Sequence, residues 1–197
     1  MIDSLFDADD AATPLTADER NGLIPSHITL RRELNEVEHA GILAADGWAF
    51  SRRRDVLDEK VLCRLHKEMF KNVWKWAGEY SKETGRNIGV DCYKIGPDLH
   101  QLIDDVKYWI EHKTYPPDEI AIRFHHWLVS IHPFPNGNGR HARLAADLLA
   151  VQLGCPRFTW GRESIGAVGS QIRKAYVSAL KAADNHDIGP LLIFARS

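Results

Sequence analysis

Cysteine is scarce in this sequence. The 197 residues include only three, Cys63, Cys92 and Cys155. They are odd in number and far apart in the chain, which excludes a disulfide framework and a zinc cluster built on cysteine. We interpret them as buried free thiols. Because such thiols fit a reducing compartment, the cysteine content predicts a cytoplasmic protein.

Long hydrophobic runs and an excess of charge are also missing. No apolar run reaches the roughly 18 residues that a membrane-spanning helix requires. Residues 1–10 are acidic and lack the basic-then-apolar order of a signal peptide. The 25 Lys and Arg residues nearly balance the 27 Asp and Glu residues, which gives a net charge of −2. Because general nucleic-acid binders usually carry a basic excess, we expect neither membrane contact nor direct binding of nucleic acid.

What is present is the composition of an ordinary globular domain, with 44% hydrophobic and 26% charged residues. The length suits one domain with a short appended segment, and no internal repeat or low-complexity linker interrupts it. We divide the chain into three parts. Residues 1–25 form an N-terminal arm that is laid on the surface or partly disordered, residues 26–54 contain an N-terminal helix, and residues 55–197 form the core domain.

Hydrophobic periodicity predicts a mostly α-helical bundle. The expected helices combine an apolar stripe at helical spacing with start or stop signals, and they cover about residues 26–45, 55–69, 98–110, 118–131, 138–153, 170–183 and 187–195. The segment 80–95 breaks this pattern, because Ile88 and Val90 alternate around a glycine. That arrangement predicts a small β-hairpin.

The segment with the clearest chemistry is residues 132–143, His-Pro-Phe-Pro-Asn-Gly-Asn-Gly-Arg-His-Ala-Arg. A glycine-containing loop opens onto a helix whose first backbone amides have no partner within the helix, so the loop favours an anion. Arg140 and Arg143 share one face of the first turns and can hold phosphate oxygens. His132, on the other side of the loop, can accept a proton near neutral pH. Residue types alone leave a second interpretation open, in which the loop is a turn between core helices with its arginines facing water.

This segment resembles the motif of the Fic family, His-Pro-Phe-x-Asp/Glu-Gly-Asn-Gly-Arg-x-x-Arg. Every fixed position matches except the acidic one, where this chain has Asn136. The resemblance extends over about residues 55–195, through stretches at 65–66, 76–79, 87–90 and 176–194. The helix containing Glu33 to Glu38 and the Pro-Asn-Gly-Asn variant of the loop also resemble the bacterial, mobile-element-linked subgroup called mobile mystery protein B.

The resemblance implies a Fic-type helical bundle that transfers AMP from ATP onto a Ser, Thr or Tyr hydroxyl of a target protein. His132 would accept the hydroxyl proton. The phosphates would be held by the loop and the two motif arginines, that is, by Asn136, Gly137, Asn138, Gly139, Arg140 and Arg143. The hairpin would be the family's flap and would dock the target backbone through Asn87, Ile88, Gly89 and Val90. A regulatory partner protein and a homodimer are further expectations.

Asn136 is the departure from the family pattern. The family's acid at this position binds the Mg²⁺ that bridges the phosphates, whereas an amide offers a carbonyl oxygen without charge. We therefore expect weak or absent Mg²⁺ binding at Asn136 and weak or regulated activity. The alternative is a catalytically impaired Fic module that binds a nucleotide or a protein, although a pure binder has no need of His132.

Many Fic proteins are inhibited by a glutamate that pairs with the second motif arginine, here Arg143. Glu33, within Thr29–Leu34, nearly matches that pattern, and Glu38 on the same helix is a rival. The alternative interpretation is that these glutamates belong to an acidic helix face exposed to solvent. Thr159–Ser164 matches the inhibitory pattern equally well, which shows how common the pattern is. His125 and His126 adjoin the motif, but without further ligands they indicate packing or hydrogen bonding rather than a metal site.

Overall fold

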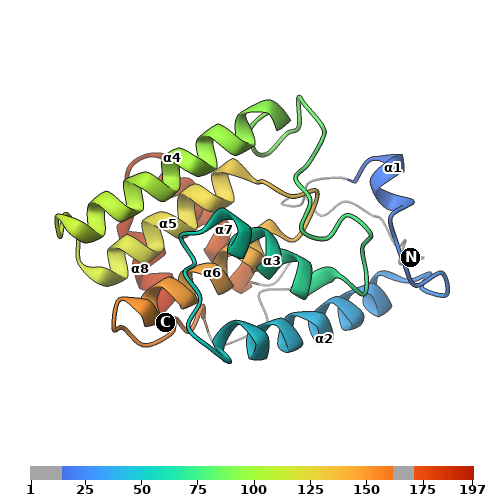
Figure 1. Ribbon diagram of the computed structural model, residues 1–197, viewed down its shortest axis with the longest axis horizontal. Coiled ribbons are helices and arrows are strands. Elements are labelled where there is room, and N and C mark those ends of the chain that lie inside the picture. The colour runs from blue at the N-terminus through green and yellow to red at the C-terminus, as the bar shows by residue number, and fades with distance from the viewer. Residues whose placement is uncertain (1–14, 162–170) are drawn as a thin grey trace.

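The computed structural model describes residues 15–161 and 171–197, and the statements below concern those residues. They form the helices α1 (Ala17–Arg20), α2 (Arg31–Phe50), α3 (Glu59–Phe70), α4 (Cys92–Glu111), α5 (Pro117–Ile131), α6 (Asn138–Gln152), α7 (Gln171–Asp184) and α8 (Gly189–Arg196). Figure 1 shows α2 and α4 on opposite sides of the molecule with α5 and α6 between them. The expectation of a mostly helical bundle is confirmed.

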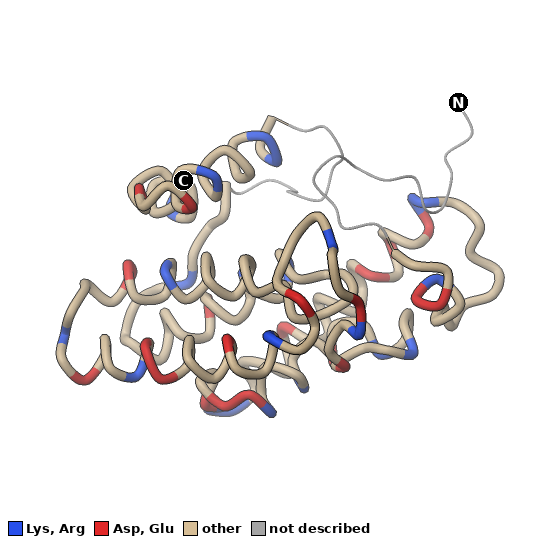
Figure 2. Tube along the Cα trace, turned by 90° about the horizontal axis from the view of Figure 1, so that it is seen from above, with Lys and Arg blue, Asp and Glu red and all other residues tan. Residues whose placement is uncertain are grey.

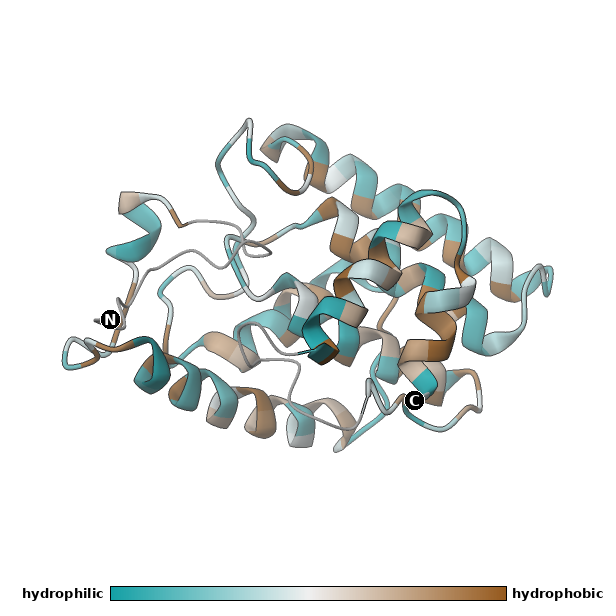
Figure 3. Cartoon of the chain, turned by 180° about the vertical axis from the view of Figure 1, so that it is seen from behind, coloured by the Kyte–Doolittle hydropathy of each residue, from teal (hydrophilic) through white to brown (hydrophobic). Residues whose placement is uncertain are grey.

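The core lies along α5 and α6, which pack side by side. Ten of the fifteen residues of α6 are buried, so this helix has almost no solvent-facing side. Figure 3 shows hydrophobic colour concentrated in the central helices. In the view of Figure 2, charges of both signs are interspersed along the helices. No helix in the described ranges is long and apolar enough to cross a bilayer.

Three helices begin elsewhere than the sequence predicts. α3 begins at Glu59 rather than near residue 55, because the side chain of Asp58, not that of Asp55, caps it by accepting from the Lys60 amide at 2.9 Å. α2 begins at Arg31 rather than near residue 26, because Leu30 is extended and the amides of Thr29 and Leu30 donate to the Glu33 carboxylate instead. α4 begins at Cys92 rather than Asp98, although Pro97 lies in its second turn and removes one backbone donor. Burial of Ile95, which is 1% exposed, favours this early start.

The predicted hairpin is not seen, since residues 80–91 contain no strand. The ends of this segment bond to the last residue of α5 and to the loop after it rather than to each other. The Ser81 amide donates to the Pro133 carbonyl at 2.8 Å, and the Val90 amide donates to the Ile131 carbonyl at 3.2 Å. The backbone groups that a hairpin would pair internally therefore fasten the segment across His132. We call residues 80–91 the flap segment.

Part of the predicted N-terminal arm lies in the described ranges, and it packs on the connection after α3. The Ile24 amide donates to the Val73 carbonyl at 2.9 Å, and Lys75 donates to the Gly22 carbonyl at 2.9 Å. An antiparallel bridge joins Leu23 to Trp74. Residues 1–14 of the arm lie outside the described residues.

Candidate active site

His132 terminates α5 in a left-handed backbone conformation, with φ 56° and ψ 57°. This conformation costs a non-glycine residue about 1 kcal/mol or more, so its surroundings must maintain it. Pro133, which follows, cannot continue the helix. The chain therefore leaves α5 sharply and presents the His132 side chain beside the loop that leads into α6.

The loop is braced from inside by Asn138. Its side-chain oxygen accepts from the Phe134 amide at 2.9 Å, and its side-chain nitrogen donates to the Phe134 carbonyl at 2.7 Å. Asn138 is 2% exposed and Phe134 is 1% exposed. The Asn138 side chain is thus a structural brace, and what this residue offers to an anion is its backbone at the start of α6.

His66 on α3 is a second brace, and no role for it was predicted from the sequence. Its Nδ1 accepts from the Gly78 amide at 2.9 Å, so its Nε2 carries the proton that is donated to the Asn136 carbonyl at 3.0 Å. Its ring stacks on Phe134 with centroids 3.8 Å apart. Burial holds the pKa of His66 well below its usual value, which keeps the ring neutral. The sequence signal that pointed to His66 was its position in the stretch at residues 65–66, which resembles the Fic family.

Gly137 is the N-cap of α6 and is also left-handed, with φ 80°. A Cβ on Gly137 would lie 2.6 Å from the ring of Phe70. Only glycine both adopts this left-handed backbone conformation readily and leaves room for the Phe70 ring. The amides at the start of α6 are consequently presented on a tight turn backed by an aromatic ring.

Asn136 turns its side chain back onto the loop. Its Oδ1 accepts from the Gly137 amide at 2.6 Å and from the Arg140 guanidinium at 3.4 Å. That oxygen is the only one that the Asn136 side chain could offer to a cation, and it already faces a positive group. No group of three or more His, Cys, Asp or Glu side chains suited to a metal occurs among the described residues. The donors of this loop therefore do not fit Mg²⁺.

The two motif arginines have different surroundings. Arg140 forms an ion pair with Glu38 at 2.7 Å, and the other Glu38 oxygen accepts from the Trp74 indole at 2.8 Å. Arg143 instead lies over the ring of Tyr176, with its guanidinium carbon 5.3 Å from the ring centroid. Glu33 caps the start of α2, where its carboxylate accepts from the amides of Thr29 and Leu30. These hydrogen bonds lower the pKa of Glu33. Of the two candidate inhibitory glutamates, Glu38 is the one that contacts a motif arginine, and that arginine is Arg140 rather than the expected Arg143.

His132 is neutral at pH 7. Burial, opposed in part by a hydrogen bond to the Val129 backbone and assisted by the nearby Arg86 guanidinium, lowers its pKa to about 4. A neutral imidazole can accept a proton. The geometry therefore suits His132 to the role of a general base beside the anion-binding turn.

The flap segment closes over His132 from the other side. Gly89 has φ 96°, and a Cβ there would lie 2.6 Å from the Cβ of His132. Arg86 donates to the Pro135 carbonyl at 3.3 Å and forms an ion pair with Glu19 of α1. Neither charged residue could be recognised from the sequence, because nothing local marks a contact between positions that are 67 residues apart.

The neighbouring histidines, His125 and His126, form hydrogen bonds with residues of α7. His125 Nε2 lies 3.0 Å from the Tyr176 hydroxyl, and His126 Nε2 lies 2.8 Å from a carboxylate oxygen of Asp184. These contacts agree with the expectation that the pair serves packing and hydrogen bonding. The three cysteines are free thiols, as expected, but they are partly rather than fully buried.

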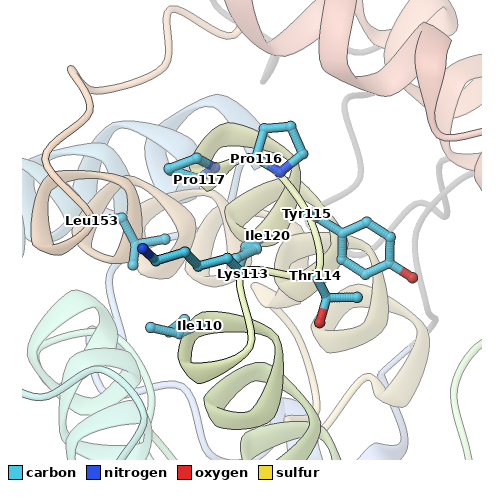
Figure 4. A pocket seen from close by; sticks show the side chains of 8 residues that line it. All are labelled: Ile110, Lys113, Thr114, Tyr115, Pro116, Pro117, Ile120 and Leu153. Carbon is cyan, nitrogen blue, oxygen red and sulfur yellow. The ribbon is translucent and has the colours of Figure 1, made fainter.

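A separate hollow of about 550 Å³ lies at the turn between α4 and α5 (Figure 4). It is lined by Ile110, Lys113, Thr114, Tyr115, Pro116, Pro117, Ile120 and Leu153. It adjoins the first residues of α5, whereas His132 follows the last, and a helix of this length spans about 22 Å. The hollow is therefore distinct from the His132 site.

Comparisons with known proteins identify relatives of this chain. The model of the Fic/DOC family matches residues 56–150. A Drosophila melanogaster relative named protein adenylyltransferase Fic is 36% identical over 138 residues, which are 68% of this chain and 26% of the relative. The relative of the same name from Aedes aegypti is 26% identical over 145 residues, covering 72% of this chain and 28% of the relative. The chain thus spans about a quarter of the length of these curated relatives.

Solved structures share the fold. Fic-1 from C. elegans (residues 134–508) superposes with a TM-score of 0.67 at 23% identity, covering 90% of this chain and 51% of that one. The BepC protein from Bartonella tribocorum, solved with bound AMPPNP, superposes with a TM-score of 0.67 at 17% identity, covering 92% and 97%. At these identities the structures establish the fold alone.

Proposed function

Because the chain contains a Fic/DOC family domain over residues 56–150, we propose that it transfers AMP from ATP onto a Ser, Thr or Tyr hydroxyl of a target protein. One observation carries the proposal. A neutral imidazole, that of His132, stands at the entry of the loop that leads from α5 to the start of α6, where backbone amides and two arginines favour an anion. The nucleotide-bound state of BepC supports a nucleotide as the ligand.

In the proposed reaction the target hydroxyl oxygen bonds to the α-phosphorus of ATP, and the bond between that phosphorus and the oxygen leading to the β-phosphate breaks. His132 accepts the hydroxyl proton, and pyrophosphate leaves. The backbone of residues 137–139 and the guanidinium groups of Arg140 and Arg143 hold the phosphates. His66, Phe134 and Asn138 keep the loop in shape. The roles of His132, the loop backbone and the two arginines are those that the family resemblance implies.

Asn136 limits the reaction in this proposal. Mg²⁺ would supply charge neutralisation at the phosphates, and an acid would normally hold it. Here the Asn136 oxygen is engaged by Gly137 and Arg140, so we propose weak activity with little dependence on a bound metal. The alternative that this observation favours is a nucleotide-binding module without catalysis.

Glu38 is the proposed inhibitory residue. It is 4% exposed and neutralises Arg140 at 2.7 Å. An arginine whose charge is paired in this way attracts a phosphate less strongly. ATP can therefore bind Arg140 only if it displaces the buried Glu38 carboxylate. Glu33 is engaged in capping α2 and is the weaker candidate.

The flap segment remains the proposed docking site for the target backbone, through residues 87–90. The proposal further includes membership of the mobile mystery protein B-like subgroup, a bacterial and cytoplasmic setting, a regulatory partner protein and a homodimer. These assignments extend the sequence resemblance.

The test uses ATP labelled on the α- or the γ-phosphate, incubated with the protein and a lysate. AMP transfer predicts protein label from the α-phosphate alone, whereas phosphotransfer predicts label from the γ-phosphate alone. His132→Ala should remove the label, because a general base contributes about 10²–10⁴-fold, and it should leave ATP binding nearly intact. Tight ATP binding without label from either position would support the non-catalytic module.

A further inference from the structure

Glu38 on α2 binds a different partner with each oxygen of its carboxylate. Oε2 accepts from the Arg140 guanidinium at 2.7 Å, and Oε1 accepts from the Trp74 indole at 2.8 Å. Glu38 is 4% exposed and Trp74 is 2% exposed, so both groups are shielded from water. The carboxylate therefore stands between a guanidinium that the proposed function assigns to the phosphates and an indole N–H that lies outside the motif.

Trp74 is held in place by contacts that do not involve Glu38. It lies in the connection after α3, where its amide donates to the Phe70 carbonyl at 2.9 Å. Its ring stacks on Trp76 with centroids 4.9 Å apart, and the residue forms an antiparallel bridge to Leu23. α2, which carries Glu38, packs against α3 (Figure 1). The fold thus fixes the indole N–H independently of the carboxylate.

The indole matters most when Glu38 loses Arg140. A buried carboxylate is costly unless charged partners or hydrogen bonds compensate it, and a hydrogen bond to an ionised group is stronger than one between neutral groups. While Arg140 neutralises Glu38, the indole adds to a carboxylate that is already paired. Once a phosphate has taken Arg140, the indole remains as a donor to the carboxylate left behind. The free energy that Trp74 contributes is therefore larger in the nucleotide-bound state than in the free state.

We propose that Trp74 is a positioning residue that holds the Glu38 carboxylate in place when the phosphates of ATP displace it from Arg140. The inference rests on the proposed function, because it takes ATP as the ligand and Glu38 as the residue that the phosphates displace. In this role Trp74 makes the inhibitory contact reversible. It favours phosphate binding by acting through Glu38 rather than through the nucleotide.

The test removes the indole N–H and keeps the bicyclic ring. Trp74 is replaced by 3-benzothienylalanine, which has sulfur in place of the N–H group, because Trp74→Phe would leave a cavity in the core. ATP affinity, measured by calorimetry, should fall about tenfold, in line with the loss of a hydrogen bond to a charged group. Adenosine affinity should stay the same. The matched control is the same replacement at Trp76, whose indole donates to the neutral Glu19 carbonyl at 3.0 Å, and it should change neither affinity.

A second background separates this role from a merely structural one. In Glu38→Gln no buried charge is left behind, so the replacement at Trp74 should change ATP affinity by less than about twofold. Undiminished ATP affinity in the single variant, or an equal loss in the Glu38→Gln background, would overturn the inference. An equal fall in adenosine affinity would also overturn it, because a distorted site loses both ligands.

A measurement on the hydrogen bond itself completes the test. The indole N–H proton resonance of Trp74, identified by its absence from the 3-benzothienylalanine variant, should lie further downfield in the wild type than in Glu38→Gln. It should keep that position when ATP saturates the protein. A shift in the ATP complex to the position seen in Glu38→Gln would show that the carboxylate leaves both partners, which contradicts the inference. A wild type that binds ATP no more tightly than adenosine would instead refute the proposed function, on which the inference rests.

Discussion

Gly89 lies so close to His132 that no side chain fits between them. A Cβ on Gly89 would be 2.6 Å from the His132 Cβ and 3.3 Å from the Ile131 carbonyl oxygen, and the residue has φ 96°. The flap segment and the proposed base are thereby in direct backbone-to-side-chain contact. The left-handed conformation of His132 is maintained, in part, by this close approach.

Gly89→Ala should therefore disable the site. The added methyl group meets His132 in a conformation that disfavours any side chain, so either the flap segment or the imidazole must move. We expect AMP transfer to fall by at least about tenfold with ATP affinity preserved, measured by label incorporation and calorimetry. Gly85→Ala is the control, because it is also left-handed, at φ 67°, but a Cβ there meets nothing within 4 Å. Equal losses in the two variants would show that backbone strain alone is responsible.

Glu38→Gln should release Arg140. The amide keeps an acceptor for the Trp74 indole and removes the charge that neutralises the guanidinium. ATP should bind several-fold more tightly, on the order of tenfold, as measured by calorimetry at low salt. Glu36→Gln, an exposed neighbour on the same helix, should leave affinity unchanged. Tighter binding in Glu33→Gln with no effect in Glu38→Gln would transfer the inhibitory role to Glu33.

Glu19→Gln should destabilise the protein. Glu19 and Arg86 are each 10% exposed and form an ion pair, and removal of one partner leaves a buried charge, at a cost of about 3 kcal/mol. Urea unfolding measures the change. Glu79→Gln is the control, since its pair with Lys82 at 3.6 Å is exposed and should be worth less than about 1 kcal/mol. A loss no larger in Glu19→Gln than in Glu79→Gln would contradict a structural role for the pair.

Stability should fall as the pH is lowered from about 6.5 towards 4. Burial holds the pKa of His132 and His141 at about 4 and that of His125 at about 3, below the unfolded value of 6.5. In this window the unfolded chain binds more protons, so the free energy of unfolding decreases by up to about 1.4 kcal/mol per pH unit for each such group. Urea unfolding at about pH 7.5 and about pH 5, on either side of the unfolded pKa, tests this.

His141→Gln should flatten that pH dependence, whereas His100→Gln should not, because the His100 side chain is 75% exposed. The imidazole of His141 is joined to the Leu62 carbonyl at 3.0 Å, so His141→Gln also changes the stability at every pH. The two variants are therefore compared only through the slope of the free energy of unfolding with pH. A slope that is the same in both would show that His141 does not contribute.

Asn136→Asp should strengthen metal binding and raise transfer. The carboxylate supplies the negative charge and the second oxygen that the amide lacks. Mg²⁺ titration of the transfer rate is the measurement, and Asn136→Ala is the comparison that removes the side-chain oxygen altogether. A rate and Mg²⁺ dependence equal to those of the unmutated protein would refute the role given to this position.

The motif and the periodic helices could be predicted from the sequence because both depend on local spacing. The bundle, the bounds of α5 and the start of α6 at Asn138 follow from apolar stripes, Pro133 and Gly137. The early start of α4 and the missing hairpin could not be predicted. In both cases, contacts made across the fold outweigh local preference, through burial of Ile95 and through flap amides that bond to the last residue of α5 and to the loop after it.

The sequence by itself determined the chemical groups of the site, namely one imidazole, two guanidiniums and a glycine turn without an acidic residue. Only the tertiary structure decided how those groups are used. It pairs Arg140 with Glu38, 102 residues away, supports Arg143 with Tyr176, and places Arg86 and Gly89 against the loop that carries His132. These partners are close in space because of the way the helices pack. The spacing of residues along the chain does not reveal those distances.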